Sequence, residues 1–142
     1  MATERDRIIF YTDGASRGNP GDSAWAYILL SENGEQLASQ SGYIGRGTNN
    51  QAEYFAVIRA LQRASEITTG TLEGYSDSQL VVNQITGKWK VKNPELNRLC
   101  NRAKELQEDF VTVSFKHVPR SHEMIAHVDG MCNDTLDSIQ SF

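Results

Sequence analysis

The sequence predicts an α/β fold built on a mixed five-stranded sheet flanked by helices. Apolar segments of strand length are interleaved with longer segments of helical periodicity. Their order along the chain is three strands, a helix, a strand, two helices, a strand and a helix. Strands joined by hairpins pair antiparallel, and strands reached through a helix are expected to lie parallel to the first. The sheet is therefore expected to be mixed.

The first part of the chain predicts a three-stranded meander. Residues 7–13 form a short apolar strand, and the glycine-rich segment that follows is expected to be a turn. Residues 23–31 and 36–44 form the second and third strands, joined through Asn33-Gly34. That dipeptide is typical of tight hairpins, so these two strands are expected to be antiparallel neighbours.

A long helix is expected over residues 48–66. Thr48 and Gln51 are spaced as a capping box, which marks a helix start. The residues after this cap are apolar apart from Glu53 and Arg59 for about ten positions, a pattern typical of a buried helix.

The second half alternates strands and helices. Asn93-Pro94 is a cap followed by a proline at the first helical position. Apolar residues then recur at helical spacing, at Leu96, Leu99, Ala103, Leu106 and Phe110. The expected elements are a strand over residues 71–77, helices over 78–86 and from 94 onward, a strand over 111–118 and a helix over 123–139.

Composition favours one globular domain over residues 1–142. The chain is 39% hydrophobic and 23% charged, and no apolar run is long enough to span a bilayer. The charged N-terminus lacks the apolar segment of a signal peptide, and Cys100 and Cys132 fit free thiols in a reducing compartment. We expect a cytoplasmic monomer without membrane association.

The charge distribution is uneven. The net charge is −4, yet residues 88–120 carry eight Lys and Arg against four Asp and Glu. A basic stripe of this kind can follow a phosphate backbone even in an acidic protein. The alternative interpretation is a solvated helix face.

Two aspartates are expected at strand ends. Asp13 ends the first predicted strand and Asp77 ends the fourth. Sites in such sheets form beyond the carboxyl ends of parallel strands, so the two carboxylates would face one crevice if the strands are neighbours. A buried carboxylate is costly unless its charge is compensated.

Two further acids lie on predicted helices. Glu53 is expected in the first turn of an otherwise apolar helix, and Asp129 lies between Ile125 and Cys132 on the inward face of the last helix. A dipole partner and a solvated acid are the respective structural alternatives. Several carboxylates without a histidine–cysteine set favour hard divalent cations held by oxygen ligands. Such cations would compensate the charge of Asp13.

Four segments carry a resemblance to a known family: YTDGASRGNPG, GTNNQAEYFAVIRAL, SDSQLVVNQITG and VDGMCNDTLD. In this order they resemble type 1 ribonuclease H over residues 8–137. The resemblance implies the ribonuclease H-like fold and an endonuclease that hydrolyses the RNA strand of RNA–DNA hybrids with two Mg²⁺ or Mn²⁺ ions. Marked sequence specificity is not expected, and the products carry 5′-phosphates. The implied metal-binding and catalytic acids are Asp13, Glu53, Asp77 and Asp129.

The resemblance also implies a substrate-binding set, in which Thr48 faces a phosphate of the DNA strand. Amide and hydroxyl side chains suit the shallow minor groove and the 2′-hydroxyl that distinguishes RNA from DNA. Some family members use a loop histidine in turnover. His122 is the candidate chosen here, with His127 and His117 as alternatives and an exposed histidine without a role as the other interpretation. The matching substrate contacts are Asn19, Thr48, Asn49, Asn50 and Gln79.

Two features depart from the family pattern. The connection over residues 87–92 is too short for the basic protrusion of larger bacterial members, although it keeps three lysines and Trp89. The usual offset after Arg120 lands on His127, whereas the spacing back from Asn133 lands on Asp129. We favour Asp129 as the fourth acid, because helical spacing is fixed by backbone geometry and a loop absorbs extra residues at little cost.

Two other functions remain open from the sequence. One is a non-catalytic module that binds hybrids or RNA on the same fold, and retention of all four acids counts against it. The other is a related nuclease with broader specificity, for example towards double-stranded RNA.

Overall fold

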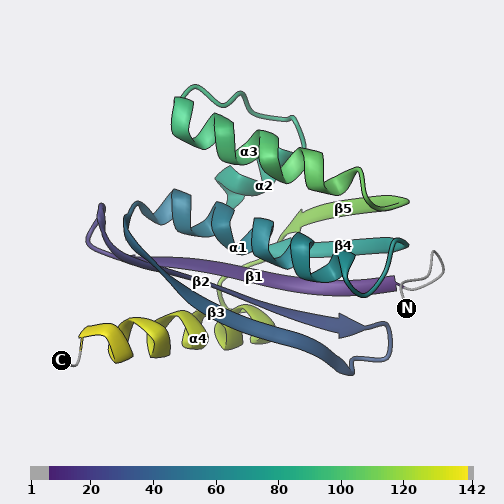
Figure 1. Ribbon diagram of the computed structural model, residues 1–142, viewed down its shortest axis with the longest axis horizontal. Helices are drawn as coiled ribbons and strands as arrows, with labels where there is room; N and C mark the ends of the chain where they lie inside the picture. Colours follow the sequence, from purple (N-terminus) through teal and green to yellow (C-terminus); the bar gives the residue numbers. More distant parts are fainter. Residues whose placement is uncertain (1–6, 141–142) are drawn as a thin grey trace.

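The computed structural model describes residues 7–140, in which one mixed sheet is covered by helices on both faces (Figure 1). The five strands lie in the order β3-β2-β1-β4-β5. The predicted fold class is confirmed, including the parallel placement of the two later strands beside the first.

The sheet combines an antiparallel meander with a parallel pair. In the meander, β2 lies between β1 and β3, and on the other side of β1 the strands β4 and β5 run parallel to it. The strand bounds are β1 (Arg7–Arg17), β2 (Gly21–Ser31), β3 (Gln36–Gly47), β4 (Thr71–Ser76) and β5 (Thr112–His117).

The helices divide unequally between the two faces (Figure 1). Helices α1 (Asn49–Ser65), α2 (Gln79–Ile85) and α3 (Pro94–Gln107) cover one face, and α4 (Glu123–Gln140) covers the other under β1, β2 and β3. Within residues 7–140, no helix combines the length and the apolar character needed to cross a membrane.

Strand alternation divides the core into two layers. On β2, the side chains of Trp25, Tyr27 and Leu29 pack with α1 and α3, whereas Ala24, Ala26 and Ile28 pack against α4. The layer beneath α4 includes the small strand side chains of Ala24 and Ala26. The layer beneath α1 and α3 contains fully buried Phe10 and Tyr54, and burying a side chain such as that of Phe10 contributes about 1.5–3 kcal/mol.

Strand β1 continues past the end that the sequence indicated. It pairs with β4 only as far as Tyr11 opposite Tyr75, but it pairs with β2 as far as Arg17 opposite Asp22. The prediction that Asp13 ends this strand is therefore wrong, because the antiparallel partner extends the ladder through the glycine-rich segment. The turn itself shrinks to residues 18–20, where Gly18 supplies a φ of 99°.

The long helix begins as predicted, but Glu53 does not lie in its first turn. Thr48 Oγ1 accepts a hydrogen bond from the Gln51 backbone N–H, and Gln51 Oε1 accepts one from the Thr48 N–H. The helix then begins at Asn49, which makes Glu53 its fifth residue. The alternative role of Glu53 as a dipole partner loses its basis, because the dipole acts mainly in the first turn.

Candidate active site

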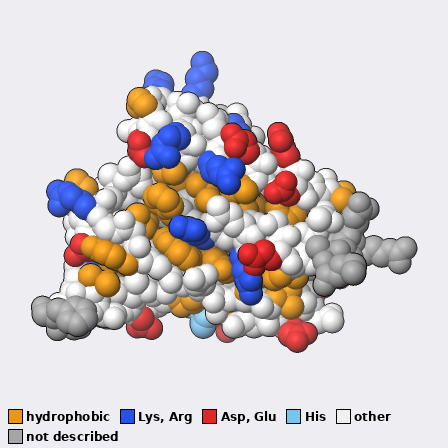
Figure 2. Space-filling model, in the orientation of Figure 1, with side chains coloured by type: hydrophobic (Ala, Val, Ile, Leu, Met, Phe, Trp, Pro, Cys, Tyr) orange, Lys and Arg blue, Asp and Glu red, His pale blue; other side chains and the backbone are white. Residues whose placement is uncertain are grey.

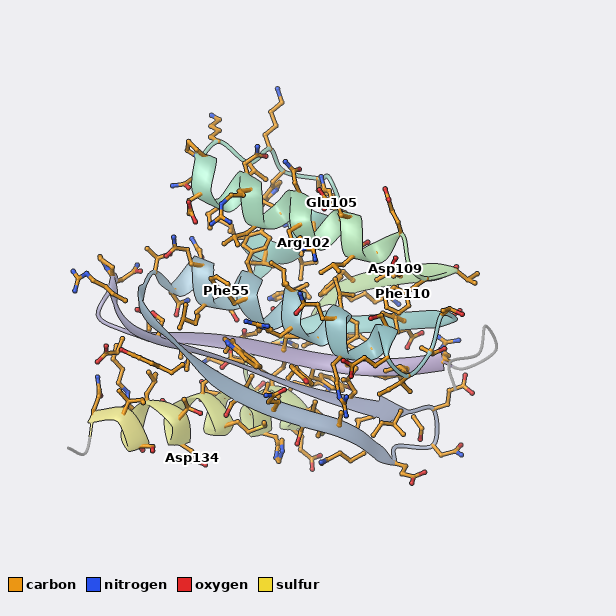
Figure 3. All side chains as sticks on the ribbon, in the orientation of Figure 1. Phe55, Arg102, Glu105, Asp109, Phe110 and Asp134 are labelled. Carbon is orange, nitrogen blue, oxygen red and sulfur yellow. The ribbon has the colours of Figure 1, made fainter. Side chains whose placement is uncertain are left out.

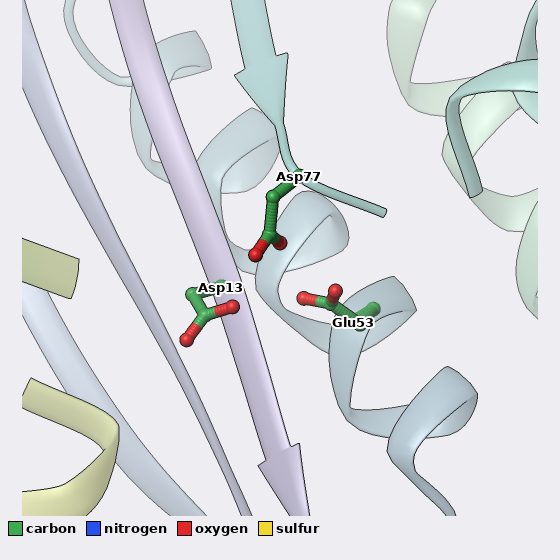
Figure 4. Close-up of side chains that lie close together, drawn as sticks. All are labelled: Asp13, Glu53 and Asp77. Atoms are coloured by element: carbon green, nitrogen blue, oxygen red, sulfur yellow. The ribbon is translucent and has the colours of Figure 1, made fainter. Parts of the chain in front are cut away.

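Three carboxylates from three elements meet at the centre of the sheet (Figure 4). Asp13 lies within β1, Glu53 on α1, and Asp77 directly after the end of β4. One carboxylate oxygen from each residue lies within 4.8 Å of the other two. Asp13 and Glu53 are buried, and Asp77 is half-buried.

The sheet opens where β4 ends and β1 continues. Tyr11 opposite Tyr75 is the last pair between the two strands. Asp13 therefore lies two residues past the pairing, and Asp77 follows Ser76 at the end of β4. The predicted meeting of Asp13 and Asp77 in one crevice is confirmed, although a gap in the pairing creates it rather than two aligned strand ends.

Gly14 lets α1 approach this gap closely. A Cβ at Gly14 would overlap the backbone of Ala52 and Glu53, so only glycine fits there. The Gly14 N–H donates a hydrogen bond to Glu53 Oε1 at 2.5 Å. The same glycine therefore admits the helix and fixes the Glu53 carboxylate.

Asp129 reaches the site from the opposite face of the sheet. It lines the same cavity of about 260 Å³ as the other three acids, and it is one of the groups that raise the pKa of Asp13, after burial. Its neighbours Ile125 and Cys132 are fully buried, as expected for the inward face of α4. His127 is exposed and is not among the residues that line the cavity.

Burial and neighbouring acids raise the pKa of Asp13, Glu53 and Asp77. The pKa of Asp13 rises to about 8 because of burial, a hydrogen bond that its protonated form would donate to Asp129, and the charge of Asp77. Burial and the charges of Asp13 and Asp77 hold the pKa of Glu53 well above its usual range. Burial also raises the pKa of Asp77, although the nearby Arg120 guanidinium opposes this. Proximity of like charges and loss of solvent both disfavour the ionised forms.

The donor set fits a hard divalent cation. Asp13 Oδ2 is buried and has no hydrogen-bond partner within residues 7–140, which leaves it free to be a ligand. All four side chains offer carboxylate oxygens, the ligands that Mg²⁺ and Mn²⁺ prefer. Bound cations would also remove the repulsion that raises the pKa values of Asp13, Glu53 and Asp77.

Four of the five predicted substrate residues lie together beside the cavity. Asn49 lines it, and Asn19 Oδ1 accepts a hydrogen bond from the Asn49 N–H at 3.0 Å. Asn19, Thr48 and Asn50 line an adjoining hollow of about 220 Å³ that extends towards the start of α3. Gln79 is exposed on the first turn of α2, two residues after Asp77. The structure thus brings four residues of the predicted set together and leaves Gln79 outside both hollows, and the role of all five in binding stays a prediction.

His122 has a structural environment of its own. Its Nδ1 accepts a hydrogen bond from the Met124 N–H at 3.1 Å at the start of α4, and its ring packs against Tyr11 with centroids 5.1 Å apart. It is not among the residues that line the carboxylate cavity. Its predicted part in turnover stays a prediction, as do the parts of the exposed His117 and His127.

Arg17, Arg120 and Asn133 also line the cavity, and the sequence did not assign them to the site. Arg17 could have been found by strand alternation, because it lies on the same face of β1 as Asp13. Ending the predicted strand at Asp13 hid that relation. Arg120 had been counted only as one member of the basic stripe, and its position depends on how the loop before α4 folds.

A larger groove lies between α1 and α3, away from the acids. Its volume is about 460 Å³, and Figure 2 shows hydrophobic side chains there flanked by basic ones. Phe55 and Arg102 belong to it, and Glu105 is the acid among its lining residues (Figure 3). A single carboxylate cannot assemble a cation site, so the chemistry belongs to the smaller cavity.

Comparisons with known proteins agree with this assignment. The model of a family described as reverse transcriptase-like matches residues 11–129. The chain is 45% identical to ribonuclease HI of Halobacterium salinarum, covering 92% of this chain and 65% of that protein. It is 34% identical to ribonuclease H of Chlorobium phaeovibrioides, covering 94% of this chain and 92% of that protein.

Solved structures give the same result. The crystal structure of RNase H1 from Halobacterium salinarum superposes with a TM-score of 0.88 at 44% identity, covering 93% of this chain and 98% of that one. LC11-RNase H1 in complex with an RNA/DNA hybrid superposes with a TM-score of 0.86 at 36% identity, covering 93% and 98%.

The relatives differ in length. The chain spans 65% of the Halobacterium protein and 36% of the mycobacterial relatives that also match. The match nevertheless includes every segment that contributes an acid to the cavity, since it extends from Tyr11 to Asp129. The protein therefore belongs to the ribonuclease H family.

Proposed function

We propose that this protein is a metal-dependent endoribonuclease that hydrolyses the RNA strand of RNA–DNA hybrids with two Mg²⁺ or Mn²⁺ ions. The observation that carries the proposal is the convergence of Asp13, Glu53 and Asp77 within 4.8 Å, with Asp129 lining the same cavity. Likeness to a ribonuclease H1 that was crystallised with an RNA/DNA hybrid supports the choice of substrate.

The acids would hold the cations from both faces of the sheet. Glu53 approaches from the α1 side, and Asp129 approaches from α4. When bound, two divalent cations lower the pKa of an attacking water and neutralise charge on the attacked phosphate and the leaving oxygen. The residues of this chain supply a fixed, buried set of oxygen ligands, so no side-chain nucleophile is required.

The rim supplies groups that suit a hybrid. Asn49, Asn19 and Thr48 present uncharged donors and acceptors beside the acids. Such groups suit the minor groove and the 2′-hydroxyl of an RNA strand. Arg120 places a positive charge at the cavity near Asp77, where it would face a phosphate of the cut strand.

Two other functions remain alternatives. A pure binding module is disfavoured because four acids beside a phosphate would weaken binding unless cations neutralise them. A nuclease that also cuts double-stranded RNA would use the same cavity, so cleavage of an RNA duplex decides between the two specificities. The cytoplasmic location and the monomeric state also stay predictions.

The decisive experiment incubates the protein with end-labelled RNA–DNA hybrid, RNA duplex and DNA duplex, in Mg²⁺, Mn²⁺ or EDTA. We expect cleavage of the RNA strand of the hybrid, with 5′-phosphate products, only when a divalent cation is present. The matched control is Asp13→Asn, which keeps the size of the side chain and removes its charge. Cleavage that persists in excess EDTA would overturn the metal-dependent reaction, and equal cleavage of the RNA duplex would replace hybrid specificity with the broader one.

A further inference from the structure

Arg17 lies at the end of β1, and its guanidinium contacts several residues of α4. Its Nη2 is 2.6 Å from Asp137 Oδ1 and donates hydrogen bonds to the Asn133 carbonyl oxygen at 3.3 Å and to Asn133 Oδ1 at 3.4 Å. Its Nη1 donates to Gln140 Oε1 at 2.8 Å. The side chain is one-third exposed and lines the carboxylate cavity.

Asn133 contacts both Arg17 and one of the acids, Asp129. Its Nδ2 donates a hydrogen bond to Asp129 Oδ2 at 3.4 Å, and Asp129 lines the cavity together with Asp13. A guanidinium has only donors and a carboxylate only acceptors. Arg17 therefore requires the oxygen of the Asn133 amide, and Asp129 requires its nitrogen. Both partners select the same orientation of that amide.

We propose that Arg17 is a positioning residue that sets the Asp129 carboxylate through Asn133 and thereby tunes cation binding. This inference deepens the proposed function, since it concerns the affinity of the same site for Mg²⁺. The Asn133 amide is held at both ends, its oxygen by Arg17 and its nitrogen by Asp129. Without Arg17 the amide would be held only at its nitrogen end. The donor to Asp129 would then be placed less firmly, and the Asp129 carboxylate would sample a wider range of orientations.

Simple electrostatics predicts the opposite result. Arg17 is a positive charge beside a cation site, so its removal by itself would tighten Mg²⁺ binding. Positioning predicts weaker binding, on the scale of the 10–100-fold losses that follow removal of groups that orient metal ligands. The direction of the change therefore separates the two effects.

The test measures the Mg²⁺-induced rise in thermal midpoint across a Mg²⁺ titration, without substrate, for the wild type, Arg17→Ala and Gln140→Ala. Gln140→Ala is the matched control, because it removes a contact of Arg17 to the end of α4 and leaves Asn133 untouched. We expect Arg17→Ala to raise the apparent Kd for Mg²⁺ about tenfold or more. We expect Gln140→Ala to leave that Kd unchanged.

A double-mutant cycle with Asn133→Ala tests the pathway. If Arg17 acts through Asn133, the double variant shows no larger shift in Kd than Asn133→Ala alone. In the cleavage assay, the Mg²⁺ concentration for half-maximal rate should rise in Arg17→Ala while the KM for hybrid stays the same. Tighter or unchanged Mg²⁺ binding, an equal loss in Gln140→Ala, or additive effects in the double variant would each overturn the inference. A Mg²⁺-induced rise in thermal midpoint that is present in the wild type and lost in Asp13→Asn shows that the cation site works. Failure of this inference is therefore distinguishable from failure of the proposed function.

Discussion

Asp129 and His127 lie two residues apart on α4 and face different surroundings. Asp129 lines the cavity together with Asp13, whereas His127 is exposed. Helical geometry explains the difference, since two residues along a helix rotate a side chain by more than half a turn. Counting from Arg120 across the loop would have selected the histidine.

We predict that Asp129→Asn lowers kcat on hybrid at saturating Mg²⁺ by about 100-fold or more, the scale reached when one electrostatic contributor at a reacting group is removed. His127→Ala should change kcat by less than about twofold, because surface groups away from the site contribute little. Steady-state kinetics on one labelled hybrid measures both. The opposite ranking of the two variants would show that the loop, not the helix, provides the fourth group.

Single residues of the site were predictable to different degrees. Asp13 and Asp77 could be predicted because acids after apolar strands are unusual and local in the sequence. Arg17 could not, because its relation to Asp13 depends on where the antiparallel partner stops pairing. A glycine-rich segment such as the one after Asp13 is compatible with both a turn and a strand. Its local sequence therefore does not determine how far the pairing of β1 with β2 extends.

At the scale of elements, two glycines have opposite environments. A Cβ on Gly14 would overlap the backbone of α1, whereas a Cβ on Gly130 in α4 would meet nothing within 4 Å. We predict that Gly14→Ala destabilises the protein and displaces Glu53, and that Gly130→Ala stabilises it by about 0.5–1 kcal/mol through helix propensity. Thermal melts of the two variants in EDTA and in Mg²⁺ measure this.

The same two glycine variants also distinguish an effect on packing from an effect on cation binding. Gly14→Ala should lose part of its Mg²⁺-induced rise in thermal midpoint, because Glu53 moves with the backbone of α1. Gly130→Ala should keep the full rise. A Gly14→Ala variant as stable as the wild type would mean that α1 can shift without disturbing the site.

The connection between α2 and α3 carries basic side chains without a helix of its own. Lys88, Lys90 and Lys92 are exposed, and Trp89 between them is 47% exposed. Nearly half of the Trp89 side chain is therefore open to solvent and is not buried between helices. Exposed lysines beside a phosphate backbone release counterions on binding and make affinity depend on salt.

We predict that changing all three lysines to glutamine weakens hybrid binding and reduces the log–log salt slope by about 0.7–0.9 for each phosphate that the protein no longer neutralises. Arg63→Gln is the control, since Arg63 lies in the last turn of α1, the end opposite Glu53. Binding of hybrid in Ca²⁺ at several salt concentrations gives the slope. A slope that stays the same in the triple variant would assign the basic stripe to solvation alone.

Element types were predicted better than element ends. The meander, the buried helix and the two parallel strands follow from patterns that lie within each segment. The ends of β1 and β3 moved outward, and α3 ended at Gln107 before the buried Phe110. In each case the end is decided by a partner distant in sequence, either a paired strand or the core that accepts an apolar side chain.

At the scale of the whole molecule, charge is separated between interior and surface. Four acids converge in one cavity, while the basic residues of 88–120 are spread over the α2–α3 connection, α3, β5 and the loop before α4, and of these only Arg120 lines the cavity. An acidic cavity next to a basic surface suits a ligand with a phosphate backbone. Its phosphates can contact the basic surface, and the divalent cations bound with it can occupy the acidic cavity. The metal-free protein, in contrast, must tolerate the repulsion among its acids.

This repulsion makes the metal-free stability depend on pH. Burial, a hydrogen bond that protonated Asp13 would donate to Asp129, and the charge of Asp77 raise the pKa of Asp13 from 3.8 to about 8, and the pKa values of Glu53 and Asp77 are raised as well. Between pH 3.8 and about 8, the folded state therefore binds more protons than the unfolded state. The free energy of unfolding must then fall as pH rises through this window.

We predict that in EDTA the thermal midpoint falls between about pH 5 and pH 8, where the folded state keeps protons that the unfolded state has already released. Asp13→Asn should flatten the fall and raise the midpoint at pH 8 by about 3 °C for each kcal/mol of repulsion removed. Asp134→Asn is the control, because Asp134 is exposed on α4 (Figure 3) and its substitution should leave the slope of midpoint against pH unchanged.

Mg²⁺ gives a second measurement at pH 8. Saturating Mg²⁺ should raise the thermal midpoint of the wild type and leave that of Asp13→Asn unchanged, since only the intact cluster gains binding energy from the cation. If the thermal midpoint in EDTA falls equally steeply with pH in the wild type and in Asp13→Asn, repulsion within the acid cluster is not the cause of the fall. That result would also remove this argument for a cation at the site.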